Sequence, residues 1–323
     1  MPDWWVWCGS VIQGPDGKYH MFAARWPKHL PFFEGYIRYS EIVRAVSDTP
    51  EGPYTFQEVV LPDRGGQFWD GRMTHNPTVL RYQDKYLLFY IGGTFQGPKP
   101  TAEELRADTP ERLNHHEIAY YSIRIGLAIA DDPAGPWIRP DRPYLEIRPG
   151  HWDNRIITNP APCITPEGFL RLYYRSNTPN GCRIGVAQAK DLDSPPERLL
   201  EDPILGNLKL EDPYVYHMGD HYEMLAKDLA PDAESSISGE YHATLHAISR
   251  DGLEWQLADP PRAASRTVTW SDGRTVTLGC LERPQLLWED GKPICLFAAV
   301  GDGPGGFRAA ENTWNMCIPL KRM

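Results

Sequence analysis

The feature that most constrains the fold is a phrase that the sequence repeats. "WDGRMTHNP" at residues 69–77 returns as "WDNRIITNP" at residues 152–160. A second pair, "TPEGPY" at 49–54 and "DPAGPW" at 132–137, has the same offset of 83 positions that separates Trp69 from Trp152. A constant offset across separate landmarks indicates duplicated architecture, for which propeller blades or solenoid turns are the usual units.

Five segments share one plan, in which a strand, a turn and an aromatic strand follow one another. They are "CGSVIQGPDGKYHMFAARW", "HNPTVLRYQDKYLLFYIGG", "TNPAPCITPEGFLRLYYRS", "EDPYVYHMGDHYEMLAKD" and "ERPQLLWEDGKPICLFAAV". "PDGK", "PEG" and "EDGK" supply turn chemistry. Outer strands are expected in "EIVRAVSD", "RIGLAIADD", "RIGVAQAKD" and "TLHAISRDG". The insert "GTFQGPKPTAEELRADTPERLNHHE" is the one segment expected to hold a short helix.

Repeated four-stranded sheets arranged radially form a β-propeller. The sequence therefore predicts an all-β, single-domain, five-bladed β-propeller over residues 1–323. The first strand of every blade would line the axis, so residues that begin those strands would meet at one end of a central channel. Asn76 and Asn159 are corresponding positions in this arrangement.

Composition excludes several classes of function. The net charge is −10 with no basic run, which argues against nucleic acid as a partner. No stretch has the apolar length of a membrane span, and the start "MPDWWVW" does not resemble a signal peptide. We expect a cytoplasmic protein, or a periplasmic or secreted one if a leader has been removed. The six cysteines show no CxxC spacing, which favours buried thiols over disulfides or zinc.

Acidic residues at the starts of first strands are the candidate catalytic groups. Blade four offers Glu211 and Asp212 in "LKLEDPYVY", and blade five offers Glu282 in "CLERPQLLW". Converging carboxylates with arginines nearby have pKa values pushed apart, so that one can donate a proton while another stays ionised. This is the equipment for cleaving a glycosidic bond.

The WDxR phrase itself has a structural interpretation and a catalytic one. In the structural one, Trp69 and Trp152 pack between blades while Asp70 pairs with Arg72 and Asp153 pairs with Arg155. Buried charges are usually paired in this way. In the catalytic one, Asp70 takes part in the chemistry.

Six motifs in order resemble the five-bladed glycoside hydrolases of family 43 and, more closely, of family 117, whose members include exo-acting 3,6-anhydro-L-galactosidases. They are "HMFAARWP", "SEIVRAVSDTPEGPY", "HNPT", "EDPYV", "SRDGLEW" and "ERPQLL". The resemblance extends from Trp5 to Leu320. It implies that Asp212 tunes the acid and holds the sugar, and that Glu282 is the proton donor or lies beside it.

The sequence departs from the family at the general base. The family places an aspartate near the start of the first inner strand, where this chain has Cys8, Gly9 and Ser10. Three explanations of this difference are open. Asp3, Asp70 or another acid acts as the base, the mechanism differs from that of the family, or the protein does not hydrolyse its ligand. Family 117 has also been assigned a histidine as the general acid. The resemblance does not give this chain such a histidine, because the residue before Glu282 is Leu281, and His75 is the substitute candidate.

Further residues are candidates for binding the sugar. They are His75, Asn76, Asn159, Arg25, Arg72, Arg155, Arg175, Lys227, Arg283, Trp7 and Trp26. Several cations at the channel mouth would favour an anionic sugar, since guanidinium groups bind carboxylates bidentately. The alternatives are ion pairs with the local acids and, for the tryptophans, packing between blades.

The histidines fit no HExxH or HxH pattern, so we expect no metal-ligating residues and no required cofactor. The alternative is a single structural cation in the central channel.

The sequence thus predicts a glycosidase that is exo-acting and inverting. Inversion implies carboxyl groups roughly 6.5–9.5 Å apart. The expected role is polysaccharide degradation by removal of a terminal sugar, with anionic and anhydro sugars among the candidates, from a plant or algal poly- or oligosaccharide. The alternatives are a glycoside phosphorylase on the same fold and a non-catalytic glycan-binding propeller. The sugar, the linkage and the oligomeric state are left open.

Overall fold

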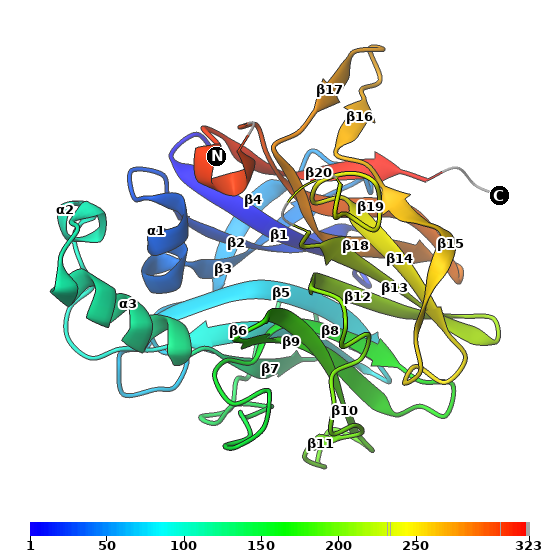
Figure 1. Ribbon diagram of the computed structural model, residues 1–323, viewed down its shortest axis with the longest axis horizontal. Helices are drawn as coiled ribbons and strands as arrows, with labels where there is room; N and C mark the ends of the chain where they lie inside the picture. Colours follow the sequence, from blue (N-terminus) through cyan, green and yellow to red (C-terminus); the bar gives the residue numbers. More distant parts are fainter. Residues whose placement is uncertain (231, 233, 304, 321–323) are drawn as a thin grey trace. The chain divides into compact units, whose positions relative to one another are not determined.

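The computed structural model describes residues 1–320 except 231, 233 and 304, so the last three residues of the predicted 1–323 domain lie outside the described part. The chain folds into two compact units. Unit 1 comprises residues 1–146, 285–298 and the C-terminal segment from residue 313, and unit 2 comprises residues 147–284 and 299–312. Figure 1 gives the element labels used below.

Unit 1 contains two antiparallel sheets and three helices. The first sheet has the order β1 (Trp4–Gln13), β2 (Tyr19–Pro27), β3 (Glu41–Ser47) and β4 (Thr55–Leu61). The second has the order β5 (Met73–Tyr82), β6 (Lys85–Gly93) and β7 (Arg124–Ala130). The helices are α1 (Phe32–Tyr39), α2 (Ala102–Arg106) and α3 (Pro110–Tyr121).

Unit 2 contains two four-stranded sheets and a separate ribbon. The sheets are β8 (Thr158–Ile164), β9 (Leu170–Thr178), β10 (Gly181–Ala189) and β11 (Glu197–Arg198), and then β12 (Leu210–Met218), β13 (His221–Asp228), β14 (Thr244–Ser249) and β15 (Gln256–Ala264). The ribbon pairs β16 (Thr267–Thr269) with β17 (Thr275–Thr277).

A fifth sheet contributes residues to both units. Its strands are β18 (Cys280–Glu289), β19 (Lys292–Gly301) and β20 (Thr313–Pro319), with the short 3₁₀ helix η1 (Gly306–Ala309) before β20. Each predicted hairpin supplies the first two strands of one sheet, and each predicted outer strand pairs next to them. The prediction of an all-β, five-bladed β-propeller is confirmed. In the described part of the chain, the second and fifth sheets have three strands and not four.

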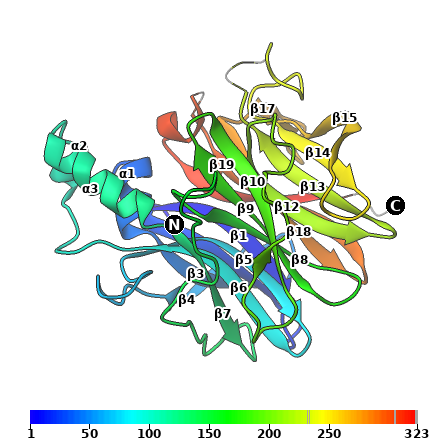
Figure 2. The ribbon, with the colours of Figure 1, turned by 60° about the horizontal axis from the view of Figure 1, so that its bottom comes forward.

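The helical content corrects one expectation. The insert between β6 and β7 holds two helices, α2 and α3, capped by Thr101 and Thr109. Helix α1 was not expected; it follows β2 directly, and its Gly35 lies so close to Trp26 that a Cβ atom there would come 2.9 Å from the indole. Figure 2 shows α1 beside α3. A short amphipathic segment next to a strand rich in aromatics gives no periodic signal long enough to identify a helix.

Each unit has its own apolar core. In unit 1, β1, β2 and β3 bury Val11, Met21 and Val43 against Phe297 of β19. In unit 2, the sheet of β8–β10 packs on that of β12–β14 through a cluster that includes Ala161, Tyr173, Val186, Val215, Met224 and Leu245. Strands buried on both faces account for the nearly continuous apolar runs in the sequence. In the part of the chain that the structure describes, no helix has the length and apolar character needed to span a bilayer.

The repeated WDxR phrase builds a buried ion network in unit 1. The Asp70 carboxylate is fully buried and accepts hydrogen bonds from Arg64 Nε (2.7 Å) and Tyr90 Oη (2.7 Å). It also forms an ion pair with Arg139 at 3.5 Å. Trp69 stacks on the Tyr90 ring, with ring centroids 5.9 Å apart.

The second copy of the phrase builds the same network in unit 2. Asp153 is fully buried and is bound by Arg148 Nε (2.9 Å), Arg198 Nη2 (3.2 Å) and Tyr174 Oη (2.7 Å). Trp152 stacks on Tyr174 at 6.1 Å. The repeat is therefore a structural device that anchors the loop before a first strand to the second strand of the same sheet.

The expected partners of these aspartates were wrong. Arg72 forms an ion pair with Asp63 at 3.7 Å and donates to the carbonyl of Gly97, while Arg155 is exposed. Two of the arginines that bind Asp70 and Asp153, Arg64 and Arg148, precede the tryptophan, and the other two, Arg139 and Arg198, follow the third strand of the sheet. Spacing within the nine-residue phrase gives no information about them.

Candidate functional site

The first strands share an irregularity at corresponding positions. The pairing register of β1, β5, β8 and β12 is interrupted between Trp7 and Ser10, His75 and Thr78, Thr158 and Ala161, and Glu211 and Tyr214, respectively. One residue in each interruption, and one in β18, has a left-handed backbone: Cys8 (φ 57°), Asn76 (50°), Asn159 (50°), Asp212 (54°) and Arg283 (54°). This conformation costs roughly 1–2 kcal/mol for a residue other than glycine, and such strain concentrates at functional sites.

These left-handed residues bind one another within each unit. In unit 2, Asn159 Nδ2 donates to Asp212 Oδ1 at 2.5 Å, and the Arg283 backbone N–H donates to Asp212 Oδ2 at 3.2 Å. The Arg283 guanidinium lies 3.7 Å from Asp212. In unit 1, the Cys8 thiol donates to Asn76 Oδ1 at 2.8 Å. Asp212 is thus the centre of the unit 2 cluster.

The residues before Asp212 and Arg283 complete a buried charge cluster. Lys227 Nζ on β13 contacts Glu282 Oε1 and lies 3.8 Å from Glu211 Oε2. Arg175 on β9 contacts the other oxygen of Glu211 and donates to Asn177 Oδ1 at 2.8 Å. Sequence reasoning singled out these acids and cations separately, and the structure brings Glu211, Asp212, Glu282, Arg175, Lys227, Arg283 and Asn159 together in unit 2.

The electrostatics of the cluster give Glu282 a distinct protonation state. Burial, helped by the negative charges of Asp212 and Glu211, raises the pKa of Glu282 to about 7 against the opposing effect of Lys227. Burial and the neighbouring Glu211 also raise the pKa of Asp212, although Arg283 and Lys227 oppose them. Glu282 is therefore able to hold a proton near neutral pH.

Glu211 and Lys227 remain charged. Burial works to raise the pKa of Glu211, but Arg175 and Lys227 outweigh it and lower the value. Burial works to lower the pKa of Lys227, but Glu282 and Glu211 outweigh it and raise the value. The cluster thus separates an ionised carboxylate from a protonatable one, which is the pattern required for acid–base chemistry.

His242 belongs to the same cluster and was considered in the sequence only as a metal ligand. Burial and the positive charge of Lys227 lower the pKa of His242 to about 4, so the imidazole is neutral at pH 7. Its backbone is also left-handed (φ 55°), and its ring stacks on Tyr241 at 3.7 Å. No local signal identifies it, because its position depends on the long loop that precedes β14.

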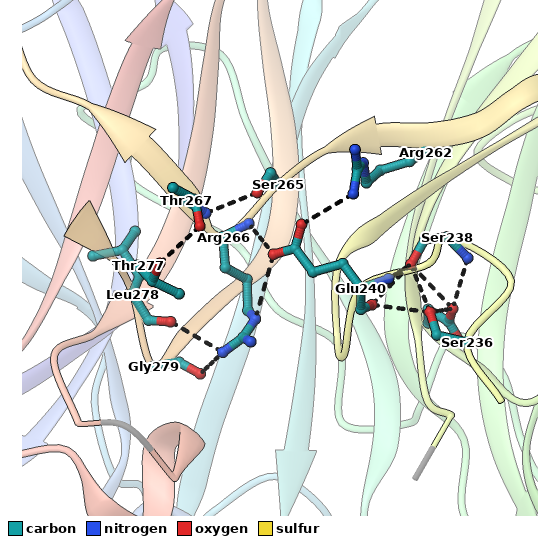
Figure 3. A network of polar contacts seen from close by, with 11 residues as sticks. Ser236, Ser238, Glu240, Arg262, Ser265, Arg266, Thr267, Thr277, Leu278 and Gly279 are labelled. Atoms are coloured by element: carbon teal, nitrogen blue, oxygen red, sulfur yellow. Dashed lines mark hydrogen bonds and ion pairs between the residues drawn. The ribbon is translucent and has the colours of Figure 1, made fainter. Parts of the chain in front are cut away.

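A polar network fixes the loop that carries His242 (Figure 3). Glu240 accepts a hydrogen bond from the Arg266 backbone N–H at 2.9 Å, and the Arg266 guanidinium donates to the carbonyls of Leu278 (3.1 Å) and Gly279 (3.0 Å). Ser236 and Ser238 donate to the Glu240 carbonyl. The network ties the loop before His242 to the residues that lead into β18, and hence to Glu282.

The candidates in unit 1 lie in a different environment. Trp7 and Trp26 are 5% and 0% exposed and pack edge-on against Phe32 of α1 at 5.1 and 4.8 Å. They leave no ring face for a sugar, so the packing interpretation applies to both. His75 is bound to Ser40 Oγ at 2.8 Å and stacks on Tyr36 at 4.7 Å.

The remaining charged candidates are engaged elsewhere. Arg25 binds Glu41 at 2.9 Å and lies over the Trp4 ring. Asp70 is fully buried and bound by Arg64, Arg139 and Tyr90, so its assignment as a catalytic residue is corrected to a structural one. Among the described residues, no group of three or more His, Cys, Asp or Glu side chains is arranged to hold a metal ion.

Structural comparison defines the fold class. A family 117 glycoside hydrolase, Zg3597 from the marine bacterium Zobellia galactanivorans, superposes with a TM-score of 0.65 at 15% identity over 98% of this chain and 85% of its own. CoXyl43, a family 43 β-xylosidase/α-arabinofuranosidase from a compost microbial metagenome that was solved with xylotriose, gives a TM-score of 0.60 at 14% identity over 100% and 93%.

A protein of unknown function from Dyadobacter fermentans gives a TM-score of 0.62 at 12% identity over 99% of this chain and 96% of its own. No protein-family model matches the sequence, and a comparison with curated proteins finds no match. The chain is a five-bladed β-propeller that is structurally similar to glycoside hydrolases of families 43 and 117, a fold it shares with glycosidases at low sequence identity.

Proposed function

We propose that this chain is a glycoside hydrolase that removes a terminal sugar from an oligosaccharide or polysaccharide with inversion. The observation that carries the proposal is Glu282, a buried carboxyl group with a pKa of about 7 beside two further carboxylates. A general acid has to be protonated near its working pH, and burial among like charges is the standard way to achieve this.

Glu282, Lys227 and Asp212 have the central roles in this proposal. Glu282 donates its proton to the glycosidic oxygen as the bond to the leaving group breaks, while a water molecule attacks the anomeric carbon from the opposite face and releases its proton to the solvent. Lys227, which contacts Glu282, stabilises the carboxylate that remains. Asp212, held by Asn159 and Arg283, accepts a hydrogen bond from a sugar hydroxyl.

The cations of the cluster support a neutral sugar over an anionic one. Arg175 is paired with Glu211, Lys227 with Glu282, and Arg283 with Asp212. Three positive side chains therefore face three carboxyl groups. A uronate would have to displace one of these pairs, which is costly where both partners are buried.

A phosphorylase is the second candidate, and the environment of Cys8 favours it. This residue occupies in β1 the left-handed position that Asp212 occupies in β12, and its thiol is bound to Asn76. A neutral thiol does not activate water as a carboxylate would. Inorganic phosphate, which carries its own nucleophilic oxygen, would need no such base.

The test is a screen of terminal glycosides and neutral oligosaccharides with and without inorganic phosphate. The proposal predicts turnover without phosphate, loss of at least about 100-fold in kcat for Glu282→Gln, a comparable loss for Asp212→Asn, and wild-type activity for Glu289→Gln, a control at the other end of the same strand. Product-pattern analysis checks exo-action, and nuclear magnetic resonance of the first product checks inversion.

Three outcomes would contradict the hydrolase. Full activity in both Glu282→Gln and Asp212→Asn would show that these residues do not form the active site. Turnover only with phosphate, giving a sugar phosphate, identifies the phosphorylase. Glycan binding in calorimetry without turnover identifies a binding protein.

A further inference from the structure

Unit 1 contains a cavity between its helices α1, α2 and α3, which are labelled in Figure 1. The volume of the cavity is about 310 Å³, at the small end of the range that is typical of ligand pockets. Helix α1 contributes Arg38 to its lining, α2 contributes Leu105, and α3 contributes Arg112 and His115. Ala107, in the segment between α2 and α3, also lines it.

The two arginines of the lining share one carboxylate. Glu34 of α1 accepts hydrogen bonds from Arg38 Nη1 at 2.5 Å and from Arg112 Nη1 at 3.3 Å. Arg112 also lies 4.0 Å from Asp108, but that carboxylate is fully exposed to solvent. Burial, against the opposing effect of Glu34, lowers the pKa of the Arg38 guanidinium. The wall of the cavity therefore carries more positive charge than its one buried carboxylate neutralises.

Both arginines also have hydrogen-bond donors in excess. The Arg38 side chain is 0% exposed, and its Nε donates to His115 Nδ1 at 3.4 Å. The Arg38 Nη2 and Arg112 Nε atoms are buried, and neither has a hydrogen-bond partner among the described residues. Leaving a buried donor of a charged group unpaired is costly. An anionic acceptor in the cavity would remove this cost.

His115 supplies a further donor at the same wall. Because Arg38 donates to its Nδ1, this nitrogen is the acceptor and Nε2 carries the proton of the neutral ring. Burial and the positive charge of Arg38 lower the pKa of His115, so the ring is neutral at pH 7. Its Nε2 can therefore donate to an anion without adding a charge to the cavity.

The rest of the lining limits the charge and the shape of a ligand. Leu105 is buried, and together with Pro100 and Ala107 it gives the cavity an apolar part. Glu104 and Glu111 also line the cavity, and both are exposed. Their carboxylates would repel a second negative charge on a ligand. The lining thus favours a single negative charge on an apolar body.

We propose that the cavity between α1, α2 and α3 is a binding site for a small monocarboxylate with an apolar body, such as an aromatic acid. Arg38 and Arg112 share the carboxylate of the ligand as they share that of Glu34, and the apolar body packs on Leu105. Arg112 is 18% exposed, and a rotation of its side chain opens the buried donors to the ligand. The site does not depend on the proposed glycosidase activity.

The experiment uses benzoate as the probe and the folded full-length chain. Calorimetry measures binding, and hydrogen–deuterium exchange locates it. We expect saturable binding of one benzoate per chain, with slower exchange in α2 and α3. Benzamide has the same ring without a charge, and phthalate has a second carboxylate. Each should bind at least about 10-fold more weakly, because the first loses charge-assisted hydrogen bonds and the second meets Glu104 and Glu111.

Two variants test the two halves of the site. Arg112→Gln should weaken benzoate binding at least about 10-fold through loss of the charged donor. Ala107→Phe, which fills the cavity and keeps both arginines, should weaken it by a similar factor. Arg106→Gln is the matched control, because it removes an exposed arginine of α2 that does not line the cavity. This variant should bind benzoate as wild type does.

Ala107→Phe keeps the test decisive if Arg112→Gln does not fold. Absence of benzoate binding to wild type, equal affinity for benzamide, or unchanged affinity in Ala107→Phe would each overturn the proposal. Protection from exchange that is confined to segments other than the three helices would also overturn it.

Discussion

At the scale of single residues, the unit 2 cluster shows how burial and neighbouring carboxylates can outweigh a lysine that contacts a carboxyl group. Lys227 is buried and touches Glu282, yet the pKa of Glu282 stays near 7 because burial and two neighbouring carboxylates oppose the lysine. Glu282 is protonated below that pH and ionised above it. A rate that needs the protonated form should therefore fall as the pH rises through about 7.

Removal of the Lys227 charge should change the pH at which the rate falls. In Lys227→Met, Glu282 loses the partner that most strongly favours its ionised form, so its pKa rises and the fall in kcat/KM shifts upward by about one pH unit or more. The measurement is kcat/KM against pH on a substrate found in the screen. Lys292→Met, which removes an exposed lysine from β19, is the matched control. If kcat/KM falls at the same pH as in wild type, or at a lower pH, Lys227 does not act on Glu282 as proposed.

At the scale of elements, the two WDxR networks depend on glycines in the third strands of their sheets. Gly126 on β7 and Gly185 on β10 lie directly under the stacked pairs Trp69–Tyr90 and Trp152–Tyr174. A Cβ atom at Gly185 would come 2.5 Å from Tyr174 Cζ and 2.9 Å from Trp152. Only a residue without a side chain allows the tryptophan and tyrosine to reach across the sheet.

Gly185→Ala should therefore destabilise the protein by about 1–3 kcal/mol through overpacking. Gly126→Ala should behave alike, because its Cβ would come 2.6 Å from Tyr90 Cζ. Urea unfolding measures the change. Gly206→Ala, whose Cβ would come 3.1 Å from the Pro203 carbonyl oxygen, is a comparison with a milder contact, and we expect a smaller loss of stability. Equal urea midpoints for Gly185→Ala and Gly206→Ala would mean that the close packing does not limit stability.

The same elements show what the sequence predicts and where it stops. Strand pairs with turn residues between them were predictable, since each hairpin is a local unit, and so was the gathering of acids at strand starts. The partners of Asp70 and Asp153 were not, because Arg139 and Arg198 reach them through tertiary contacts. The place of His242 in the unit 2 cluster was not predictable for the same reason.

At the scale of the whole molecule, unit 1 joins distant parts of the chain. Strand β20, near the C-terminal end, supplies side chains that satisfy backbone donors of β1. Gly9 permits this approach, because a Cβ there would come 2.8 Å from Asn315 Cγ. The contact between β1 and β20 therefore relies on two side-chain acceptors in place of a sheet ladder.

Loss of one acceptor should loosen this junction. Asn315→Ala leaves the Gly9 N–H without its partner, which costs about 1–3 kcal/mol for a buried donor. Hydrogen–deuterium exchange should speed up in β1 and β20 and stay unchanged in β12 and β13. Asn312→Ala, which removes an exposed asparagine bound to Asp302, is the control. Uniform acceleration across the chain would point to global destabilisation and not to a local junction.

The left-handed residue in each first strand has one more consequence. A thiol, two carboxamides, a carboxylate and a guanidinium all occupy it with φ between 50° and 57°. Since such different groups adopt one backbone geometry, the backbone of the strand sets that geometry and the side chain does not. Each of these positions therefore accepts side chains of different chemistry. A single substitution there can change the functional group that the strand presents without a change in the strand's backbone.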